Sequence, residues 1–375
     1  MKLRKRIMGV AILLFAGLAL ATVLFLRQEK LGASPRGERL ERIRRSPHYR
    51  DGKFRNLTET PLLSEGHGWL DVLYRNYVAT IPHHHPTDTI PSVKTDLRNL
   101  PTDADALVWF GHSSYFLQLA GQRILVDPVF SGQASPLPGT LKAFPGTDVY
   151  KVADLPTIDY LFISHDHYDH LDYETIVALR DKVGTVICGL GVGSHFERWG
   201  YAPDRIVEKD WYEALSLEGG IQVYVEPARH FSGRGLSSAN TLWASYVLQT
   251  PTYTVYLGGD SGYDRHYADI GRKYGPIDLA ILDNGQYDEA WREVHNLPED
   301  VLLAARDLRA TSILPVHSSK FPLAAHPWDE PLRKLTELNE ASNFRLVTPL
   351  IGERVDLGPD SDGGQAFSRW WERVR

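Results

Sequence analysis

The feature that most constrains the fold of this chain is the segment ISHDHYDHLD at positions 163–172, which follows the apolar run YLFI. On an extended backbone, His165 and His167 point to the same side, and Asp169 and His170 follow as the chain turns toward a predicted helix. Four metal-binding side chains can therefore converge from one loop at the end of a strand. Imidazole and carboxylate together suit zinc, iron or manganese better than calcium or magnesium.

Three other β-rich runs end in a side chain of the same kind. His230 ends VYVEPARH, Asp260 ends YTVYLGGD and His317 ends SILPVH. A single histidine after a strand is usually structural or exposed to solvent. Because the pattern recurs at three strand ends beside a dense His/Asp loop, a shared metal centre is the better interpretation.

This arrangement of residues resembles the signature of the metallo-β-lactamase superfamily, over about residues 107–351. The resemblance implies an α/β (α+β) fold, a four-layer αββα sandwich with two metals at the edge of the paired sheets. It assigns His165, His167 and His230 to the first metal. It assigns Asp169, His170 and His317 to the second metal, with Asp260 bridging the two. Zinc is the default metal for such ligands, and iron and manganese accept the same set.

A narrower resemblance is carried by four segments: WFGHSSYFLQLAGQRILVDPVFS, RHFSGRG with LWASY, GGDSGY and GPIDLAILDNGQY. They look similar to N-acylphosphatidylethanolamine-hydrolysing phospholipase D and its bacterial relatives, and ascorbate-phosphate lactonase-like proteins share part of the pattern. Many relatives carry an IGAY-like segment where this chain has Asp283-Asn284-Gly285-Gln286-Tyr287. Because of this departure, the resemblance supports the metal site more strongly than the substrate.

The expected chemistry is hydrolysis by a metal-activated hydroxide. Two divalent ions about 3.5–4 Å apart lower the pKa of a shared water, and they stabilise charge on the attacked group. Asp169 would orient the hydroxide. His295 is the candidate acid or substrate ligand, although a surface histidine before a helix is an equally good interpretation. His112 either bonds a ligand carboxylate or is structural. Ser232 and Arg234 either contact an anionic substrate or belong to a turn.

Two further groups of residues have competing interpretations. Three consecutive histidines, His83, His84 and His85, cannot all point at one ion, so a surface or pocket-lining loop is preferred to a third metal site. Five aromatic residues either line an acyl groove or belong to the core, and the core is preferred for most: Trp69, Tyr74, Tyr77, Tyr287 and Trp291.

The N-terminus predicts a membrane segment. Positively charged residues precede an uncharged apolar run at 7–26, which is long enough to span about 30 Å of hydrocarbon. A signal peptide cleaved near Ala19-Leu20-Ala21 competes with an uncleaved anchor, and the anchor is favoured because the apolar run continues past that site. The short basic start favours an N-terminus in the cytoplasm and a body outside it, at the inner membrane of a bacterium, although basic residues after the span blunt this signal.

The rest of the chain predicts residues 27–64 as a basic linker and 65–375 as the hydrolase domain. Within 106–130 we expect two strands joined at 120–122, and residues 65–80 have helical apolar spacing. Strands are expected at 160–164, 185–188, 221–226, 243–249, 253–258, 279–282 and 312–316. Helices are expected at 173–182, capped by Asp172, and at 265–274, 298–308 and 331–339.

Composition narrows the function further. The net charge of −6 and the absence of a basic stripe in the body argue against nucleic acid as a partner. We expect a phosphodiesterase of the phospholipase D type acting on N-acylphosphatidylethanolamine-like lipids. The alternatives are a lactonase or other small-ester hydrolase, and a metal-binding interaction domain without catalysis.

Overall fold

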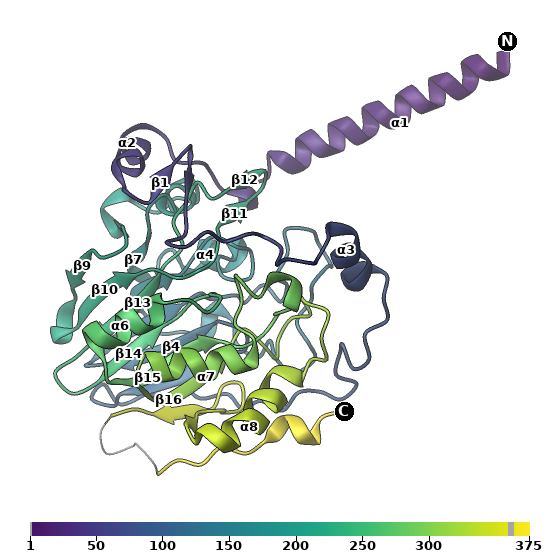
Figure 1. Ribbon diagram of the computed structural model, residues 1–375. Helices are drawn as coiled ribbons and strands as arrows, with labels where there is room; N and C mark the ends of the chain where they lie inside the picture. Colours follow the sequence, from purple (N-terminus) through teal and green to yellow (C-terminus); the bar gives the residue numbers. More distant parts are fainter. Residues whose placement is uncertain (1, 359–363) are drawn as a thin grey trace.

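Two mixed β-sheets face each other in the body, and helices cover their outer faces (Figure 1). The computed structural model describes residues 2–358 and 364–375. Within them, the first sheet has the order β18-β3-β4-β5-β6-β7-β8 and the second has the order β17-β16-β15-β14-β13-β10-β9. The strands of the first sheet are β3 (Ala106–Trp109), β4 (Tyr115–Leu119), β5 (Gln122–Val126), β6 (Ile158–Ile163), β7 (Val183–Gly189), β8 (Ile206–Lys209) and β18 (Arg354–Asp356). Those of the second are β9 (Ala214–Ser216), β10 (Gln222–Glu226), β13 (Ser245–Gln249), β14 (Thr254–Leu257), β15 (Ile277–Asp283), β16 (Ala310–Val316) and β17 (Arg345–Leu346).

Each sheet has an antiparallel half and a parallel half. Strands β5 to β8 run parallel in the first sheet, and β14 to β17 run parallel in the second. The carboxyl ends of parallel strands lie at one edge of a sheet, so loops that follow β6, β14, β15 and β16 can meet. The segment 106–130 contains three strands rather than the expected two, because Phe110 to Ser114 turn between β3 and β4 with His112 at φ 53°.

The buried side chains divide into three layers of core. Between the sheets, Leu117 and Phe162 of the first pack in one cluster with Leu248 and Ile281 of the second. Alternate residues on the same strands face outward, so that Leu161 packs with α4 and Ala280 packs with α6 and α7. This alternation gives helix, sheet, sheet and helix in succession, and the predicted four-layer αββα sandwich is confirmed.

The helices lie where the sequence pattern places them, with some differences. They are α1 (Lys2–Leu26), α2 (Gly37–Arg45), α3 (Trp69–Tyr77), α4 (Tyr173–Leu179), α5 (Gly193–Arg198), α6 (His266–Tyr274), α7 (Pro298–Asp307) and α8 (Glu330–Ser342). Helices α2 and α5 were not expected. Asp172 occupies the N-cap position of α4, but its carboxylate accepts hydrogen bonds from Ser131 N and Thr175 Oγ1 instead of capping the backbone.

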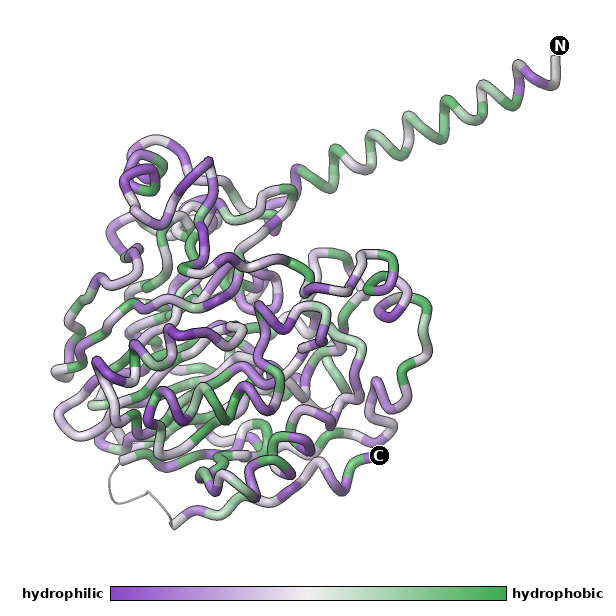
Figure 2. The backbone as a smooth tube through the Cα atoms, viewed as in Figure 1, coloured by the Kyte–Doolittle hydropathy of each residue, from purple (hydrophilic) through white to green (hydrophobic). Residues whose placement is uncertain are grey.

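The N-terminal helix extends away from the body and is apolar along most of its length (Figures 1 and 2). Residues Arg6–Leu26 of α1 are long and apolar enough to cross a membrane, a test that signal sequences also pass. The following segment folds against the body, although its composition predicted a linker. It contains the 3₁₀ turn η1 (Glu29–Leu31), α2 and the hairpin of β1 (Tyr49–Arg50) and β2 (Lys53–Phe54), and Ile43 and Phe54 are buried.

Candidate metal centre

The seven residues predicted as metal ligands come together at one edge of the paired sheets. His165, His167, Asp169 and His170 follow β6 of the first sheet. His230 follows β10, Asp260 follows β14 and His317 follows β16, all in the second sheet. The cluster therefore lies where loops from both sheets meet, and all its members except His167 are buried.

Three of the histidines form the first group of possible ligands. His165 Nε2 lies 2.8 Å from His167 Nδ1, and His230 Nε2 lies 3.3 Å from the same atom. Two nitrogens bound to one tetrahedral zinc at about 2.0–2.1 Å lie about 3.3 Å apart. The three ring nitrogens thus have nearly the spacing that a single ion requires.

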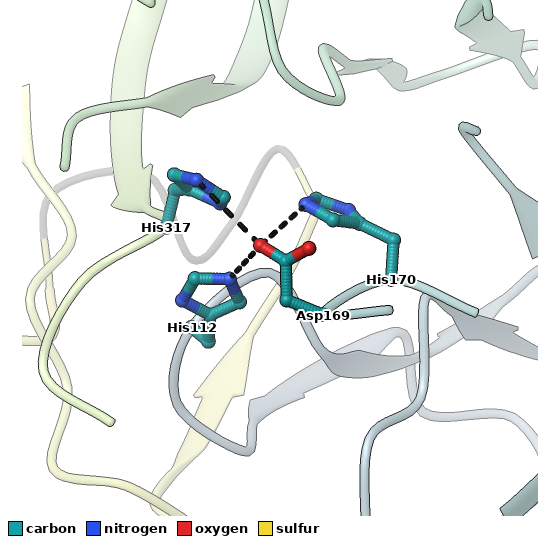
Figure 3. A group of neighbouring side chains, drawn as sticks. All are labelled: His112, Asp169, His170 and His317. Atoms are coloured by element: carbon teal, nitrogen blue, oxygen red, sulfur yellow. Dashed lines mark hydrogen bonds and ion pairs between the residues drawn. The ribbon is translucent and has the colours of Figure 1, made fainter. Parts of the chain in front are cut away.

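Asp260 lies between this group and the second. Its Oδ2 is 3.7 Å from His165 Nε2 and 3.1 Å from His170 Nε2, and its Oδ1 is 3.1 Å from His317 Nδ1. Asp169 Oδ2 lies 3.6 Å from His170 Nε2 and 4.0 Å from His317 Nε2 (Figure 3). A carboxylate placed between the two groups in this way has the position of a bridging ligand.

The pKa shifts of three histidines and two aspartates in the cluster fit a bound cation, whereas for His170, where burial opposes protonation, the carboxylates of Asp260 and Asp169 raise the pKa above its usual value. Burial lowers the pKa of His165, His230 and His317 well below the usual value, so these imidazoles are neutral and have a free electron pair. Burial opposes ionisation of Asp169 and Asp260, but the neighbouring His170 holds the pKa of both carboxyl groups below the usual range. Among the described residues, His170 Nε2 and Asp260 Oδ1 are buried without a hydrogen bond. Divalent cations would satisfy both atoms.

Outer partners hold the ligands in the orientation that the cluster needs. His230 Nδ1 donates to Val294 O at 2.9 Å, which leaves Nε2 unprotonated and facing the cluster. His170 Nδ1 lies 2.9 Å from Asp127 Oδ2, and His165 Nδ1 lies 2.9 Å from Ser164 Oγ. Such partners fix the tautomer and ring orientation of metal-binding histidines. The sequence analysis missed Asp127, although it follows the end of β5 as the ligands follow theirs.

His112 contacts a ligand carboxylate, one of the two roles that the sequence left open. Its Nε2 donates to Asp169 Oδ2 at 3.0 Å, and its side chain is fully buried (Figure 3). The backbone on both sides is also tied to the site, since His317 N donates to His112 O and His112 N donates to Ser318 O. His112 therefore orients Asp169.

Replacing His112 by alanine is expected to weaken metal binding about 10–100-fold, the usual cost of losing a partner that orients a metal ligand. The measurement is competition for metal with a chromogenic chelator. His48→Ala is the matched control, because His48 forms a similar pair with Asp210, at 2.9 Å, outside the cluster. An equal effect of the two substitutions would contradict the assigned role of His112.

His295 is part of the site and not a surface histidine. Its Nδ1 lies 2.8 Å from Asp283 Oδ2, and its ring stacks on that of His317 with centroids 5.1 Å apart. Burial opposes protonation of His295, but the Asp283 carboxylate raises its pKa above the usual value. Asp283 belongs to the segment that departs from the IGAY-like pattern, and sequence reasoning gave it no role. The structure makes it the partner of His295.

A cavity of about 730 Å³ opens directly off the cluster. His167, Asp169, Asp260, His295 and His317 line its base, and apolar side chains form most of the walls: Leu62, Leu63, Trp69, Val72, Leu73, Phe231, Trp291 and Leu323. Helix α3 supplies one wall. The site thus combines a polar, metal-binding base with a wide apolar chamber.

The structure places most of the other residues whose role the sequence left open either in the cavity or away from it. His84 and His85 line the cavity, as a pocket loop would. Of the aromatic residues, Trp69 and Trp291 line it, Tyr287 is buried and Tyr74 is exposed, and the Tyr77 side chain lies outside the described residues. Arg234 and Ser232 do not line it. Arg234 donates to backbone carbonyls and Ser232 Oγ donates to Thr241 O, so the interpretation as anion-binding residues is replaced by a structural one.

The layered sheets and the His/Asp cluster at their edge define a metal-dependent hydrolase of the metallo-β-lactamase fold. Residues 122–318 match the family described as Beta-lactamase superfamily domain, and the chain belongs to that superfamily. An uncharacterised protein of Mycobacterium tuberculosis is 38% identical over 332 residues, which cover 87% of this chain and 87% of the relative.

Two other similarities bear on the fold and on the activity. N-acyl-phosphatidylethanolamine-hydrolyzing phospholipase D 1 of Caenorhabditis elegans is 30% identical over 268 residues, which cover 67% of this chain and 73% of the relative. Igni18, a metallo hydrolase of the archaeon Ignicoccus hospitalis, superposes on 68% of this chain and 98% of its own with a TM-score of 0.52 at 20% identity. The second likeness shows the fold alone.

Proposed function

We propose that the protein hydrolyses the phosphodiester bond of an N-acylphosphatidylethanolamine-like lipid at a centre of two divalent ions, zinc by preference. The observation that carries the proposal is the apolar cavity of about 730 Å³ on the metal-binding base. A chamber of that size accepts an acyl chain while the phosphodiester lies against the cluster. The similarity to the phospholipase of Caenorhabditis elegans supports the same substrate class.

Each residue of the centre has a role in this reaction. His165, His167 and His230 would hold one ion, Asp169, His170 and His317 the other, and Asp260 would bridge them. When bound, the ions activate a water and neutralise charge on the phosphoryl group. His295 protonates the leaving oxygen, and the contact with Asp283 favours the protonated imidazole and holds it at the cavity.

The experiment that tests this proposal compares three substrates with metal-loaded, full-length protein. We expect release of phosphatidate from N-acylphosphatidylethanolamine and turnover of bis-p-nitrophenyl phosphate, with little turnover of an acyl-homoserine lactone. Hydrolysis of the lactone alone would replace the phosphodiesterase by the lactonase alternative. Metal binding without turnover of any of the three would favour the non-catalytic interaction domain.

We also propose that α1 anchors the protein in a bacterial inner membrane, with the body, residues 65–375, on the non-cytoplasmic side. Helix α3 supports a membrane contact, because it lines the cavity with one face and exposes apolar side chains on the other. Leu70 of the helix is 84% exposed, and Val78, directly after its last residue, is 69% exposed. Figure 1 shows α3 on the side of the body toward which α1 extends. A lipid could then enter the cavity from the bilayer.

The substitution Leu70→Glu is expected to lower turnover of the lipid in vesicles about tenfold, because the exposed leucine would contribute roughly 1.5–3 kcal/mol to membrane contact. Turnover of soluble bis-p-nitrophenyl phosphate is expected to stay unchanged. Leu338→Glu on α8 is the control, since Leu338 is also exposed but lies on a different helix. A loss of both activities in Leu70→Glu would point to damage of the site instead.

A further inference from the structure

The segment that leaves the N-terminal helix packs against the back of the metal-binding loop. We call residues 29–34 the connector. The Trp199 indole Nε1 donates to Glu29 O at 2.8 Å, and Glu29 pairs with Arg198 at 2.9 Å. Leu31 is buried. Composition predicted a basic linker here, whereas the contacts fix the connector on the body.

One contact runs from the connector through His195 to the metal-binding loop. Ala33 N–H donates to His195 Nδ1 at 3.0 Å, so the proton of this buried imidazole is on Nε2. Nε2 then donates to Asp166 Oδ2 at 3.1 Å. Asp166 lies in the chain between the ligands His165 and His167, and its carboxylate also accepts from Gly233 N and from Thr241 Oγ1, each at 2.8 Å. The connector therefore determines the tautomer of His195, and this tautomer donates the hydrogen bond that holds Asp166.

A second contact runs through Arg234. Its Nη1 donates to Asp166 O at 3.0 Å and to Leu171 O at 2.7 Å, so one guanidinium joins the two ends of the metal-binding loop. Its Nε donates to Lys30 O of the connector at 2.8 Å. The guanidinium also lies over the rings of Tyr168 and Trp199, at 4.2 Å and 5.1 Å from their centroids. Without the connector, this buried cation would lose one of its acceptors.

The fit between connector and body leaves no room for a side chain at position 32. Gly32 has φ 70°, and a Cβ added there would overlap His195 Nδ1. Farther along, Arg39 pairs with Glu208 at 2.6 Å and with Glu197 at 2.8 Å, which holds the end of the segment against the same face. The connector is thus fixed to the body by Glu29 at its start and by the contacts of Arg39 just after its end, and it is in close contact with the body between them.

We infer that the connector positions the metal-binding loop, so that the anchor segment is a working part of the metal centre and not only a tether. His195 and Arg234 are the positioning residues that transmit this contact. The inference rests on the metal centre proposed above. If the connector is displaced, His195 loses the contact that fixes its tautomer and Arg234 loses an acceptor, and the loop that carries four candidate ligands relaxes.

The test uses the full-length protein in detergent and measures the rate at which metal passes to a chelator. Gly32→Ala and Leu31→Asp both displace the connector without changing any residue of the loop. We expect metal release several-fold to tenfold faster in both, in line with the cost of losing an outer partner. Faster hydrogen exchange at residues 165–171 should accompany it. Gly37→Ala is the matched control, because Gly37 has φ 56° but nothing within 4 Å of an added Cβ.

The outcomes separate the two proposals. If the wild-type protein holds no metal, the metal centre itself is wrong. If it holds metal and releases it at the same rate in Gly32→Ala, Leu31→Asp and Gly37→Ala, the role of the connector is overturned. The role of the connector would also be overturned if all three variants released metal faster and did so only in proportion to their loss of unfolding free energy. Should Gly32→Ala fail to fold, Leu31→Asp decides.

Discussion

Asp260→Ala is expected to abolish turnover and to lower the metal content of the full-length protein. Asp260 lies between the two groups of candidate ligands, because its Oδ2 is 3.7 Å from His165 Nε2 of the first group and 3.1 Å from His170 Nε2 of the second. Its removal leaves the imidazoles without the negative charge that lies between them. Loss of metal-ion stabilisation of the transition state is worth several kcal/mol, so activity should fall about 10³-fold or more.

Metal content by elemental analysis and turnover of bis-p-nitrophenyl phosphate check this result together. Glu226→Ala is the matched control, because Glu226 is as buried as Asp260 but binds Lys273 and Tyr274 away from the cluster. The control is expected to lose stability and keep its metal. Full metal content with full activity in Asp260→Ala would refute the bridging role.

The convergence of the candidate ligands was readable from the sequence because the signal is local. His165, Asp260 and His317 each follow a run of β-forming residues. Because the carboxyl ends of parallel strands lie at the same edge of a sheet, these side chains come close together. The two outward-facing helical layers were also readable, since strands β6 and β15 are apolar on both faces, as in IDYLFI and IDLAILD. Local pattern and layer geometry together predict where the site lies.

The partners of the ligands were not readable, because their roles depend on contacts between distant segments. Asp283 is 12 residues from His295, and Asp127 is 43 residues from His170, and neither spacing follows a motif. The local sequence around Arg234, a basic residue between two glycines, is typical of an anion-binding turn. Its guanidinium instead binds carbonyls at Lys30, Asp166 and Leu171, and nothing in the local sequence distinguishes these two uses.

The contacts of segment 27–64 with the body were not readable from the sequence for a related reason. Its arginines and glutamates have the composition of a solvated chain, but several pair with charges on the body, as Arg39 does with Glu208 and Arg42 with Glu213. Ile43 and Phe54 of the segment are buried, but the charged pairs around them form no apolar stripe by which a sequence pattern could reveal the interface. The domain boundaries at 26 and 64 stay predictions.

His295→Ala is expected to have an effect that depends on the leaving group. His295 lies at the base of the cavity with its Nδ1 bound to Asp283, and the nearby carboxylate raises its pKa, so the imidazole can deliver a proton. The leaving alkoxide of a lipid phosphodiester needs that proton, whereas p-nitrophenolate does not. Turnover of N-acylphosphatidylethanolamine should therefore fall about 10²–10⁴-fold, and that of bis-p-nitrophenyl phosphate by less than about tenfold.

The two substrates act as controls for each other, because any change in the metal-binding residues would slow both. Metal content should stay at the wild-type level. Asp283→Asn is expected to reproduce part of the selective loss, since the asparagine keeps the contact to His295 but not the charge that favours its protonation. An equal loss with both substrates would mean that His295 supports the neighbouring rings of His230 and His317, which it contacts at centroid distances of 5.0 Å and 5.1 Å, and does not protonate the leaving group.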